Sequence, residues 1–162
     1  WSVLIALEDW EGVALGVCYL AEQGQMYWGV RGGGAYRDGQ RLTASHGQEP
    51  AEAVVCVNAL HKVSGSEWGA KLMELMGEFR AVRCFGGCVD ATLVASGRAD
   101  AWIEPSAFPW DLAALKVIAE EAGAAFFNFD GGCSIYGGNC VIAARGLEGR
   151  LRQVFGAGRA AG

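Results

Sequence analysis

The sequence predicts a mixed α/β sandwich, in which an antiparallel meander of strands precedes a half where strands alternate with helices. Two observations support this fold class. Short apolar runs separated by turn residues fill the first part of the chain. From residue 81 onward, apolar runs of strand length alternate with segments of helical period that end at glycine. The leading meander distinguishes this arrangement from a doubly wound parallel sheet.

Turn clusters divide the first forty residues into extended segments. Asp38-Gly39 is typical of a two-residue hairpin turn, so the short segments on either side of it are expected to pair. The cluster Arg31-Gly32-Gly33-Gly34 lacks the lysine and the following helix of a phosphate-binding loop, which favours a simple turn. The predicted strands are Ser2–Glu8, Val13–Leu20, Gln25–Arg31, Ala35–Arg37 and Gln40–Leu42.

The middle of the chain carries one strand and one helix. A polar connector, Ala44–Pro50, leads to the apolar run Ala53–Val57, which we predict to be a buried strand. Ser66–Phe79 has helical period, and its Trp, Leu, Met and Phe residues share one face. A stripe of this kind indicates core packing rather than contact with a cofactor.

The last eighty residues alternate between the two types of element. Gly97 and Gly123 follow helical segments at the position where a C-terminal cap is expected. No linker divides the chain, so we predict one domain over 1–162, with antiparallel strands in 1–60 and the alternating part in 61–162. The predicted elements are strands Ala81–Phe85, Ala99–Glu104, Ala124–Phe129 and Cys140–Ala144, and helices Cys88–Ser96, Trp110–Ala122 and Leu147–Phe155.

The overall charge argues against nucleic-acid and membrane partners. The formal net charge is −5, and no stripe of basic residues is present. No apolar run reaches the length of a membrane span. An acidic chain can still bind phosphate esters when bound cations supply positive charge.

The six cysteines indicate a reduced, cytoplasmic protein. They are scattered through apolar runs without a C-x-x-C pair, and this spacing argues against a zinc site or a thiol redox protein. We therefore predict buried, reduced thiols, because disulfide frameworks belong to smaller secreted chains. The cysteines are Cys18, Cys56, Cys84, Cys88, Cys133 and Cys140.

Asp111 is the first candidate for chemistry. A predicted strand ends in Glu104, a proline-bounded loop follows, and the next helix begins with Asp111 in its first turn. The free N–H groups and the dipole at a helix N-terminus favour an ionised carboxylate, which is a good ligand for Mg²⁺. Local physics allows a second interpretation, in which Asp111 only stabilises the start of the helix.

Gly86 and Gly87 form the second candidate. Glycines between a strand and a helix let backbone N–H groups approach a phosphate closely. The alternative is that they only allow the strand and the helix to pack closely.

These motifs together resemble the C-terminal portion of the inositol monophosphatase superfamily. Trp110-Asp111-Leu112-Ala113 is similar to the family's W-D-x-A signature, and Glu121-Ala122-Gly123-Ala124 to the end of the helix that follows. The run from Leu93 to Glu104 resembles L-V-A-x-G-x-x-D-x-x-x-E, and the seven-residue step from Glu104 to Asp111 also matches. Arg31 to Gly39 resembles R-G-x-G-A-x-x-x-G. The resemblance therefore covers nearly the whole chain.

The resemblance implies a layered α/β fold of the inositol monophosphatase type and a role for each candidate. Asp111 is implied to be a ligand of one catalytic Mg²⁺, and Glu104 to face the alcohol or amine portion of the substrate. Gly86 and Gly87 match the place where the family contacts substrate or phosphate. Phe85-Gly86-Gly87-Cys88 and the Tyr136–Asn139 turn favour the histidinol-phosphatase-like branch, although that branch carries an aspartate at the position of Gly87.

Two motifs of the family are absent from these 162 residues. G-E-E and D-P-[IL]-D-G-T supply further metal-binding carboxylates and the threonine that helps to activate water in the family, and neither occurs here. The chain opens inside a predicted strand, so we expect an incomplete domain that lacks its N-terminal segment, with the catalytic residues upstream of Trp1. With Asp111 as its one matching ligand, the chain is expected to be inactive alone.

Two functions remain open on the sequence. The first is a Mg²⁺-dependent phosphatase of a small phosphate monoester, either histidinol phosphate or an inositol phosphate. The second is a shortened, non-catalytic paralogue that acts as a binding or subunit-interface module. Exposed strand edges near Trp1–Glu8 favour self-association, including a homodimer.

Overall fold

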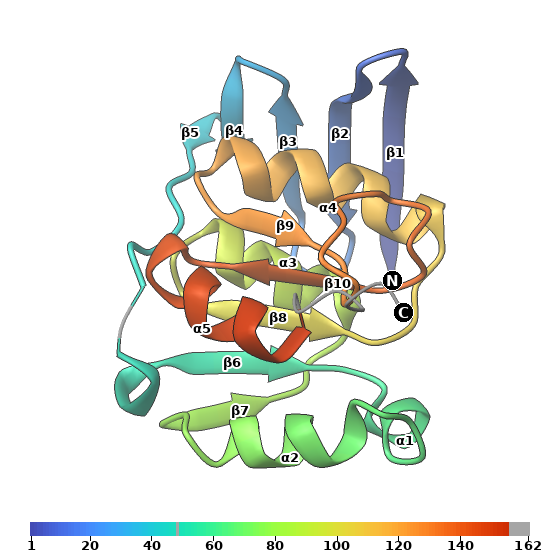
Figure 1. Ribbon diagram of the computed structural model, residues 1–162. Coiled ribbons are helices and arrows are strands. Elements are labelled where there is room, and N and C mark those ends of the chain that lie inside the picture. The colour runs from blue at the N-terminus through green and yellow to red at the C-terminus, as the bar shows by residue number, and fades with distance from the viewer. Residues whose placement is uncertain (48, 156–162) are drawn as a thin grey trace.

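A computed structural model describes residues 1–47 and 49–155, in which two five-stranded sheets enclose a layer of helices (Figure 1). In the first sheet the strands follow chain order, and every neighbouring pair is antiparallel. The predicted meander and the Asp38-Gly39 hairpin are confirmed. The strands are β1 (Ser2–Asp9), β2 (Gly12–Leu20), β3 (Gln25–Val30), β4 (Gly34–Arg37) and β5 (Gln40–Arg41).

The second sheet is mixed and has the order β7-β6-β8-β10-β9. β6 runs parallel to both β7 and β8, whereas β10 is antiparallel to β8 and β9. The predicted antiparallel section over 1–60 is therefore wrong at its end, because β6 joins the second sheet. The strands are β6 (Val54–Val57), β7 (Ala81–Arg83), β8 (Ala101–Glu104), β9 (Ala125–Phe127) and β10 (Cys140–Ala143).

Helices form two layers, one on each face of the second sheet. α3 (Gly87–Ala95) and α4 (Pro109–Glu121) lie between the sheets, and α2 (Gly69–Met76) and α5 (Arg145–Phe155) cover the other face. The helix predicted over 66–79 is shorter than expected. It begins at Gly69 and ends at Met76, directly before Gly77. Its apolar face does pack into the core, as predicted. Two short helices were not predicted: η1 (Pro50–Glu52) and α1 (Leu60–Val63).

Side chains along the strands of the second sheet point alternately to its two faces, and each face carries its own hydrophobic cluster. In β8, Trp102 belongs to the cluster between the sheets, whereas Ala101 and Ile103 belong to the cluster under α2 and α5. Because successive strand residues point to opposite faces, Glu104 is directed toward α3 and α4. The strand thus places its terminal carboxylate at the edge of the helical layer.

The outer face of the first sheet is apolar and uncovered within the described residues. The register aligns Ile5 with Val17, Val17 with Trp28, and Trp28 with Tyr36, and the last two rings stack at a centroid distance of 4.2 Å. On β1, Val3, Ile5 and Leu7 are more than half exposed. This surface is consistent with self-association of the chain, which stays a prediction.

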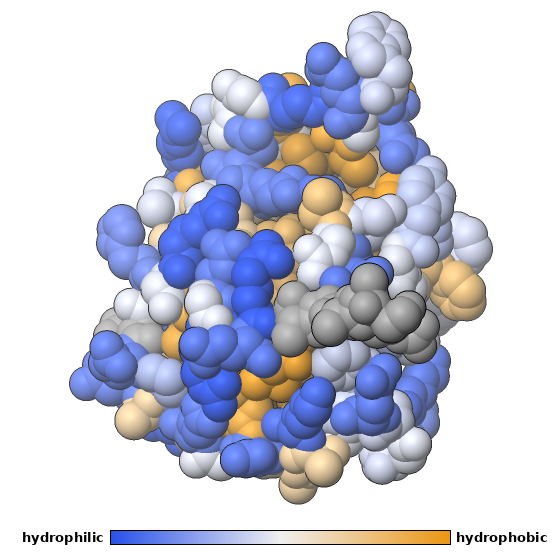
Figure 2. All heavy atoms as spheres, viewed as in Figure 1, coloured by the Kyte–Doolittle hydropathy of each residue, from blue (hydrophilic) through white to orange (hydrophobic). Residues whose placement is uncertain are grey.

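The surface over the helices is mixed. Figure 2 shows many hydrophilic residues over α2 and α5, with hydrophobic residues reaching the surface between these two helices and again between α4 and the upper ends of the strands. Throughout 1–47 and 49–155, every helix is too short or too polar to cross a bilayer.

Candidate functional site

The candidate site lies where β6 and β8 end and α4 begins, at the right of Figure 1. The two strands are parallel, and Val57 is aligned with Ile103. The next residues, Asn58 and Glu104, are therefore neighbours on the face of the helical layer. The amide Nδ2 of Asn58 donates a hydrogen bond to Oε2 of Glu104 at 3.0 Å, and both side chains are buried.

Glu104 is a buried carboxylate with few partners. Oε1 accepts a hydrogen bond from the backbone N–H of Ser106 at 3.3 Å. Burial raises the pKa of Glu104, and the hydrogen bond from Asn58 and the charge of Lys62 oppose this rise only in part. Lys62 lies at the rim, where its Nζ donates to the Ser106 hydroxyl at 3.0 Å. Glu104 is therefore placed to exchange hydrogen bonds with a polar ligand.

Asn58 was not predicted as a site residue from the sequence. Its only local signal is a polar residue directly after the buried strand β6. That signal becomes informative once β6 is known to pair in parallel with β8, because the carboxyl ends of parallel strands meet at one edge. Asn58 also accepts a hydrogen bond at Oδ1 from the thiol of Cys84, at 3.1 Å.

Asp111 stands in the first turn of α4, as predicted. Its Oδ2 accepts the backbone N–H of Phe108 at 2.9 Å, so its role in starting the helix is confirmed. Oδ1 has no hydrogen-bond partner among the described residues. Loop 105–108 joins Glu104 at the end of β8 to the start of α4, so Asp111 lies on the helix that directly follows the Glu104 strand. The role of Asp111 as a metal ligand stays a prediction.

The donor chemistry at Asp111 fits a hard cation, but the donor set is incomplete. A carboxylate oxygen is a ligand that Mg²⁺ prefers. Over 1–47 and 49–155, however, no group of three or more His, Cys, Asp or Glu side chains could hold a metal ion. Asp111 therefore fits one ligand position of a site that these residues do not complete.

Gly86 and Gly87 form the start of α3 and open onto a cavity of about 320 Å³. Gly86 has a φ of +122°, a conformation that favours glycine. A Cβ at Gly87 would meet Trp102 only at an ordinary 3.9 Å, so tight packing does not explain this glycine. Both residues are where the sequence placed them, whereas Glu104 and Asp111 lie outside the set that lines this cavity.

Two further polar groups near this loop, at Asp90 and Trp102, were not predicted from the sequence. Asp90 is fully buried, and its two carboxylate oxygens accept the backbone N–H groups of Phe85 and Gly86, each at 3.1 Å. These bonds fix the loop before α3. The indole N–H of Trp102 has no acceptor in the described part of the chain, although the residue is only 1% exposed. This unpaired donor lies inside the buried layer beside Gly87, and Trp102 is not among the residues that line the cavity.

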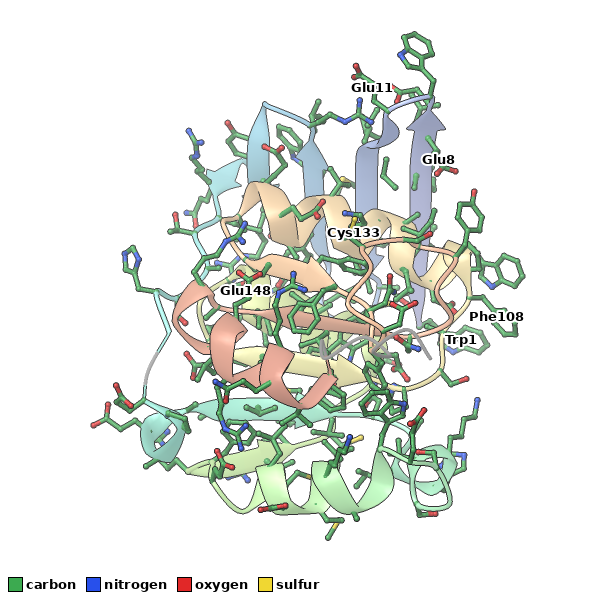
Figure 3. All side chains as sticks on the ribbon, viewed as in Figure 1. Trp1, Glu8, Glu11, Phe108, Cys133 and Glu148 are labelled. Carbon is green, nitrogen blue, oxygen red and sulfur yellow. The ribbon has the colours of Figure 1, made fainter. Side chains whose placement is uncertain are left out.

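Aromatic side chains surround the site on its exposed side. Phe108 and Trp110 are both more than half exposed, and their rings stack at a centroid distance of 4.8 Å. Figure 3 shows Phe108 and Trp1 at the same side of the molecule. Trp1 also lines the cavity at Gly86 and Gly87.

Replacing Glu104 with glutamine is expected to flatten the pH dependence of stability. The folded-state pKa of Glu104 is raised above its ordinary 4.5, so the folded chain binds this proton more tightly than the unfolded chain. The free energy of unfolding therefore falls as the pH rises from about 4.5 through the folded-state pKa. The glutamine variant lacks this loss.

Urea unfolding at pH 4.5 and pH 7 measures the effect. The difference in the free energy of unfolding between the two pH values should be smaller for Glu104→Gln than for the unmodified chain. Glu52→Gln, on exposed η1, is the matched control and should keep the original change. An identical pH dependence in all three proteins would contradict the assignment of a raised pKa to Glu104.

Comparison with known proteins gives matches to one family over nearly the whole chain. The model of the inositol monophosphatase family matches residues 1–158. The histidinol-phosphatase of Chlorobaculum parvum is 32% identical over 150 residues, which cover 93% of this chain and 58% of that protein. The inositol-1-monophosphatase of Mesorhizobium japonicum is 30% identical over 146 residues, which cover 88% of this chain and 55% of that protein.

Solved structures show the same fold. The extragenic suppressor protein suhB from Bartonella henselae has a TM-score of 0.86 and 26% identity, with 95% of this chain and 61% of that chain covered. Inositol monophosphatase II from Staphylococcus aureus has a TM-score of 0.87 and 23% identity over 95% of this chain and 59% of that one. The chain thus spans somewhat more than half the length of these relatives.

Proposed function

Because the chain belongs to the inositol monophosphatase family, we propose that it is part of a Mg²⁺-dependent phosphatase that hydrolyses a small phosphate monoester. The observation that carries the proposal is the placement of Glu104 at the end of β8 and of Asp111 in the first turn of α4, the next element in the chain. Histidinol phosphate and inositol phosphates are the proposed substrates, because relatives named for both activities match the chain at similar identity.

Each candidate residue has a role in this proposal. Mg²⁺, when bound, polarises the phosphate and lowers the pKa of a bound water. Asp111 would hold it through Oδ1, together with ligands from outside these 162 residues. Glu104, buried and hydrogen-bonded to Asn58, would accept a hydrogen bond from the alcohol portion of the substrate. The backbone N–H groups at the N-terminus of α3, at Gly87, would donate to phosphate oxygens.

A second candidate function is a non-catalytic binding or subunit-interface module. The apolar outer face of the first sheet supports it, as does the incomplete metal-binding set in the described residues. In this alternative the face around Ile5 and Val17 would bind a second copy of the chain to form a homodimer. Under either function, the six free cysteines support a reducing compartment such as the cytoplasm.

A substrate panel tests the proposed activity. The protein should be expressed from a reading frame that includes its upstream coding sequence, and assayed with Mg²⁺ on histidinol phosphate, inositol phosphates and a nucleoside bisphosphate. We expect Mg²⁺-dependent release of phosphate from histidinol phosphate or from an inositol phosphate. Absence of turnover on every member of the panel would overturn the phosphatase proposal and leave the non-catalytic module.

A further inference from the structure

We propose that Asn58 and Cys84 are positioning residues for Glu104, whose carboxylate they hold in one orientation for a hydrogen-bond donor on the alcohol portion of the substrate. This role rests on the proposed phosphatase function and adds to it the residues that orient the carboxylate. The three side chains are far apart in the sequence. The fold brings them together from the ends of β6 and β8 and from the segment that follows β7.

Asn58 is fixed to the neighbouring strand by its backbone and by its side chain. Its backbone N–H donates to the carbonyl oxygen of Ile103, the residue before Glu104, at 3.1 Å. Its amide Nδ2 donates to Oε2 of Glu104 at 3.0 Å, and the two residues are only 8% and 7% exposed. Two hydrogen bonds between the same strand ends therefore hold the amide against the carboxylate.

Cys84 determines which way the amide of Asn58 points. Its thiol donates to Oδ1 of Asn58 at 3.1 Å. Burial and the charges of Asp90 and Glu104 raise the pKa of this thiol, so it carries its hydrogen at neutral pH. An amide has one acceptor oxygen and one donor nitrogen. Because Cys84 holds the oxygen, the nitrogen is turned toward Glu104, and the reverse orientation would place the oxygen against a carboxylate.

The other polar groups at Glu104 do not replace this contact. Within the described residues, Oε2 has Asn58 as its one hydrogen-bond partner, and Oε1 has the backbone N–H of Ser106 at 3.3 Å. Lys62 donates to the Ser106 hydroxyl, at 3.0 Å, and not to the carboxylate. Removal of the amide therefore leaves Oε2 buried without a donor, which is costly for an ionised group.

The charges and thiols that face Glu104 show the direction of the effect. Burial raises the pKa of Glu104, and the hydrogen bond from Asn58 is the largest effect that lowers it, ahead of the charge of Lys62. The negative charge of Asp111 adds to the rise. Cys140, aligned with Glu104 on β10, stays uncharged because burial raises its pKa. The pKa of Glu104 should therefore rise further when the amide is lost or turned.

Titration of Glu104 in the 162-residue chain tests this arrangement without any measurement of activity. Carbon-13 labelling of the glutamate carboxyl groups gives one signal that is absent from Glu104→Gln and so belongs to Glu104. Cys84→Ala removes the thiol donor, whereas Cys84→Ser keeps a donor at the same place. We expect Glu104 to titrate at a higher pH in Cys84→Ala and at its original pH in Cys84→Ser. Cys133→Ala, at another exposed cysteine, is the matched control and should leave the titration unchanged.

Asn58→Leu removes the amide at similar side-chain size and should also shift the titration of Glu104 upward. In the protein expressed with its upstream coding sequence, this variant should raise KM for histidinol phosphate or an inositol phosphate by about 10-fold. KM for phenyl phosphate should stay unchanged, because its phenyl group offers no hydrogen-bond donor to Glu104. General damage to the site would instead affect both kinds of substrate alike.

The outcomes separate this role from the proposed function. An unchanged titration in Cys84→Ala and Asn58→Leu, or an equal shift in Cys84→Ser and Cys84→Ala, would overturn the positioning role. Equal increases in KM for phenyl phosphate and for the donor-bearing substrate would overturn it as well. Circular dichroism verifies folding, and the Cys84 variants decide the matter if Asn58→Leu does not fold. Absence of phosphate release from every substrate would overturn the proposed function, while the titration would still decide whether Asn58 and Cys84 hold Glu104.

Discussion

Replacement of Asp111 by asparagine is expected to reduce Mg²⁺-dependent phosphatase activity by about 100-fold or more in the protein expressed with its upstream coding sequence. A metal-bound carboxylate contributes several kcal/mol through the ion that it holds, and each ~1.4 kcal/mol corresponds to tenfold in rate. Asparagine keeps an oxygen that can accept the Phe108 N–H, so the start of α4 should survive. The loss should therefore arise from the removed charge and not from unfolding.

The comparison needs a matched control and a measure of folding. Asp130→Asn changes an exposed aspartate in the loop between β9 and β10 and should leave turnover unchanged. Thermal unfolding of both variants should remain close to that of the unmodified protein. Turnover of Asp111→Asn near the original rate, at the original Mg²⁺ requirement, would contradict the assignment of Asp111 as a metal ligand.

Replacement of Gly16 by alanine is expected to give a large loss of stability from a single added methyl group. A Cβ at this position would lie 2.6 Å from both Cα and the carbonyl oxygen of Ala114 in α4. Because backbone atoms cannot rotate out of the way as a side chain can, β2 and α4 must move apart. Overpacking of this kind costs about 1–3 kcal/mol. Displacement of α4 would also move Asp111.

Gly149→Ala is the matched control for this substitution. Gly149 lies exposed in α5, and no atom lies within 4 Å of the position of its added Cβ. Alanine in a helix interior is favoured over glycine by about 0.5–1 kcal/mol, so this variant should be slightly more stable. Chemical denaturation should therefore shift the two variants in opposite directions. An unchanged midpoint for Gly16→Ala would contradict the close approach of β2 and α4.

The sequence predicts local elements well where the hydrophobic periodicity and the turn or capping residues indicate the same boundaries. The meander, the Asp38-Gly39 hairpin and the helices ending before Gly97 and Gly123 all occur within a few residues of their predicted bounds. The four-residue helix α1 was missed because one turn is too short to show a helical period. The position of β6 was wrong because strand partners in a parallel sheet are far apart in sequence, and local patterns carry no information about pairing.

The site residues also divide into those with a local sequence signal and those whose roles depend on contacts between distant parts of the chain. Glu104 and Asp111 belong to a contiguous motif, so the sequence alone could single them out. Asn58 and Asp90 act through the β6–β8 register and the loop before α3, so their roles depend on the fold.

The six cysteines were predicted to be buried, which is correct for Cys18, Cys56 and Cys140. It is wrong for Cys84, Cys88 and Cys133, because a short apolar run does not show which of its residues faces solvent.

A phosphatase assay of the 162-residue chain against the longer protein tests the central claim, that this chain holds one metal ligand of a site completed elsewhere. Both proteins should be assayed at millimolar Mg²⁺ on histidinol phosphate and inositol phosphates. We expect phosphate release by the longer protein and no release above background by the 162 residues alone. Clear Mg²⁺-dependent turnover by the 162 residues would show that they form a complete site, and would contradict the claim.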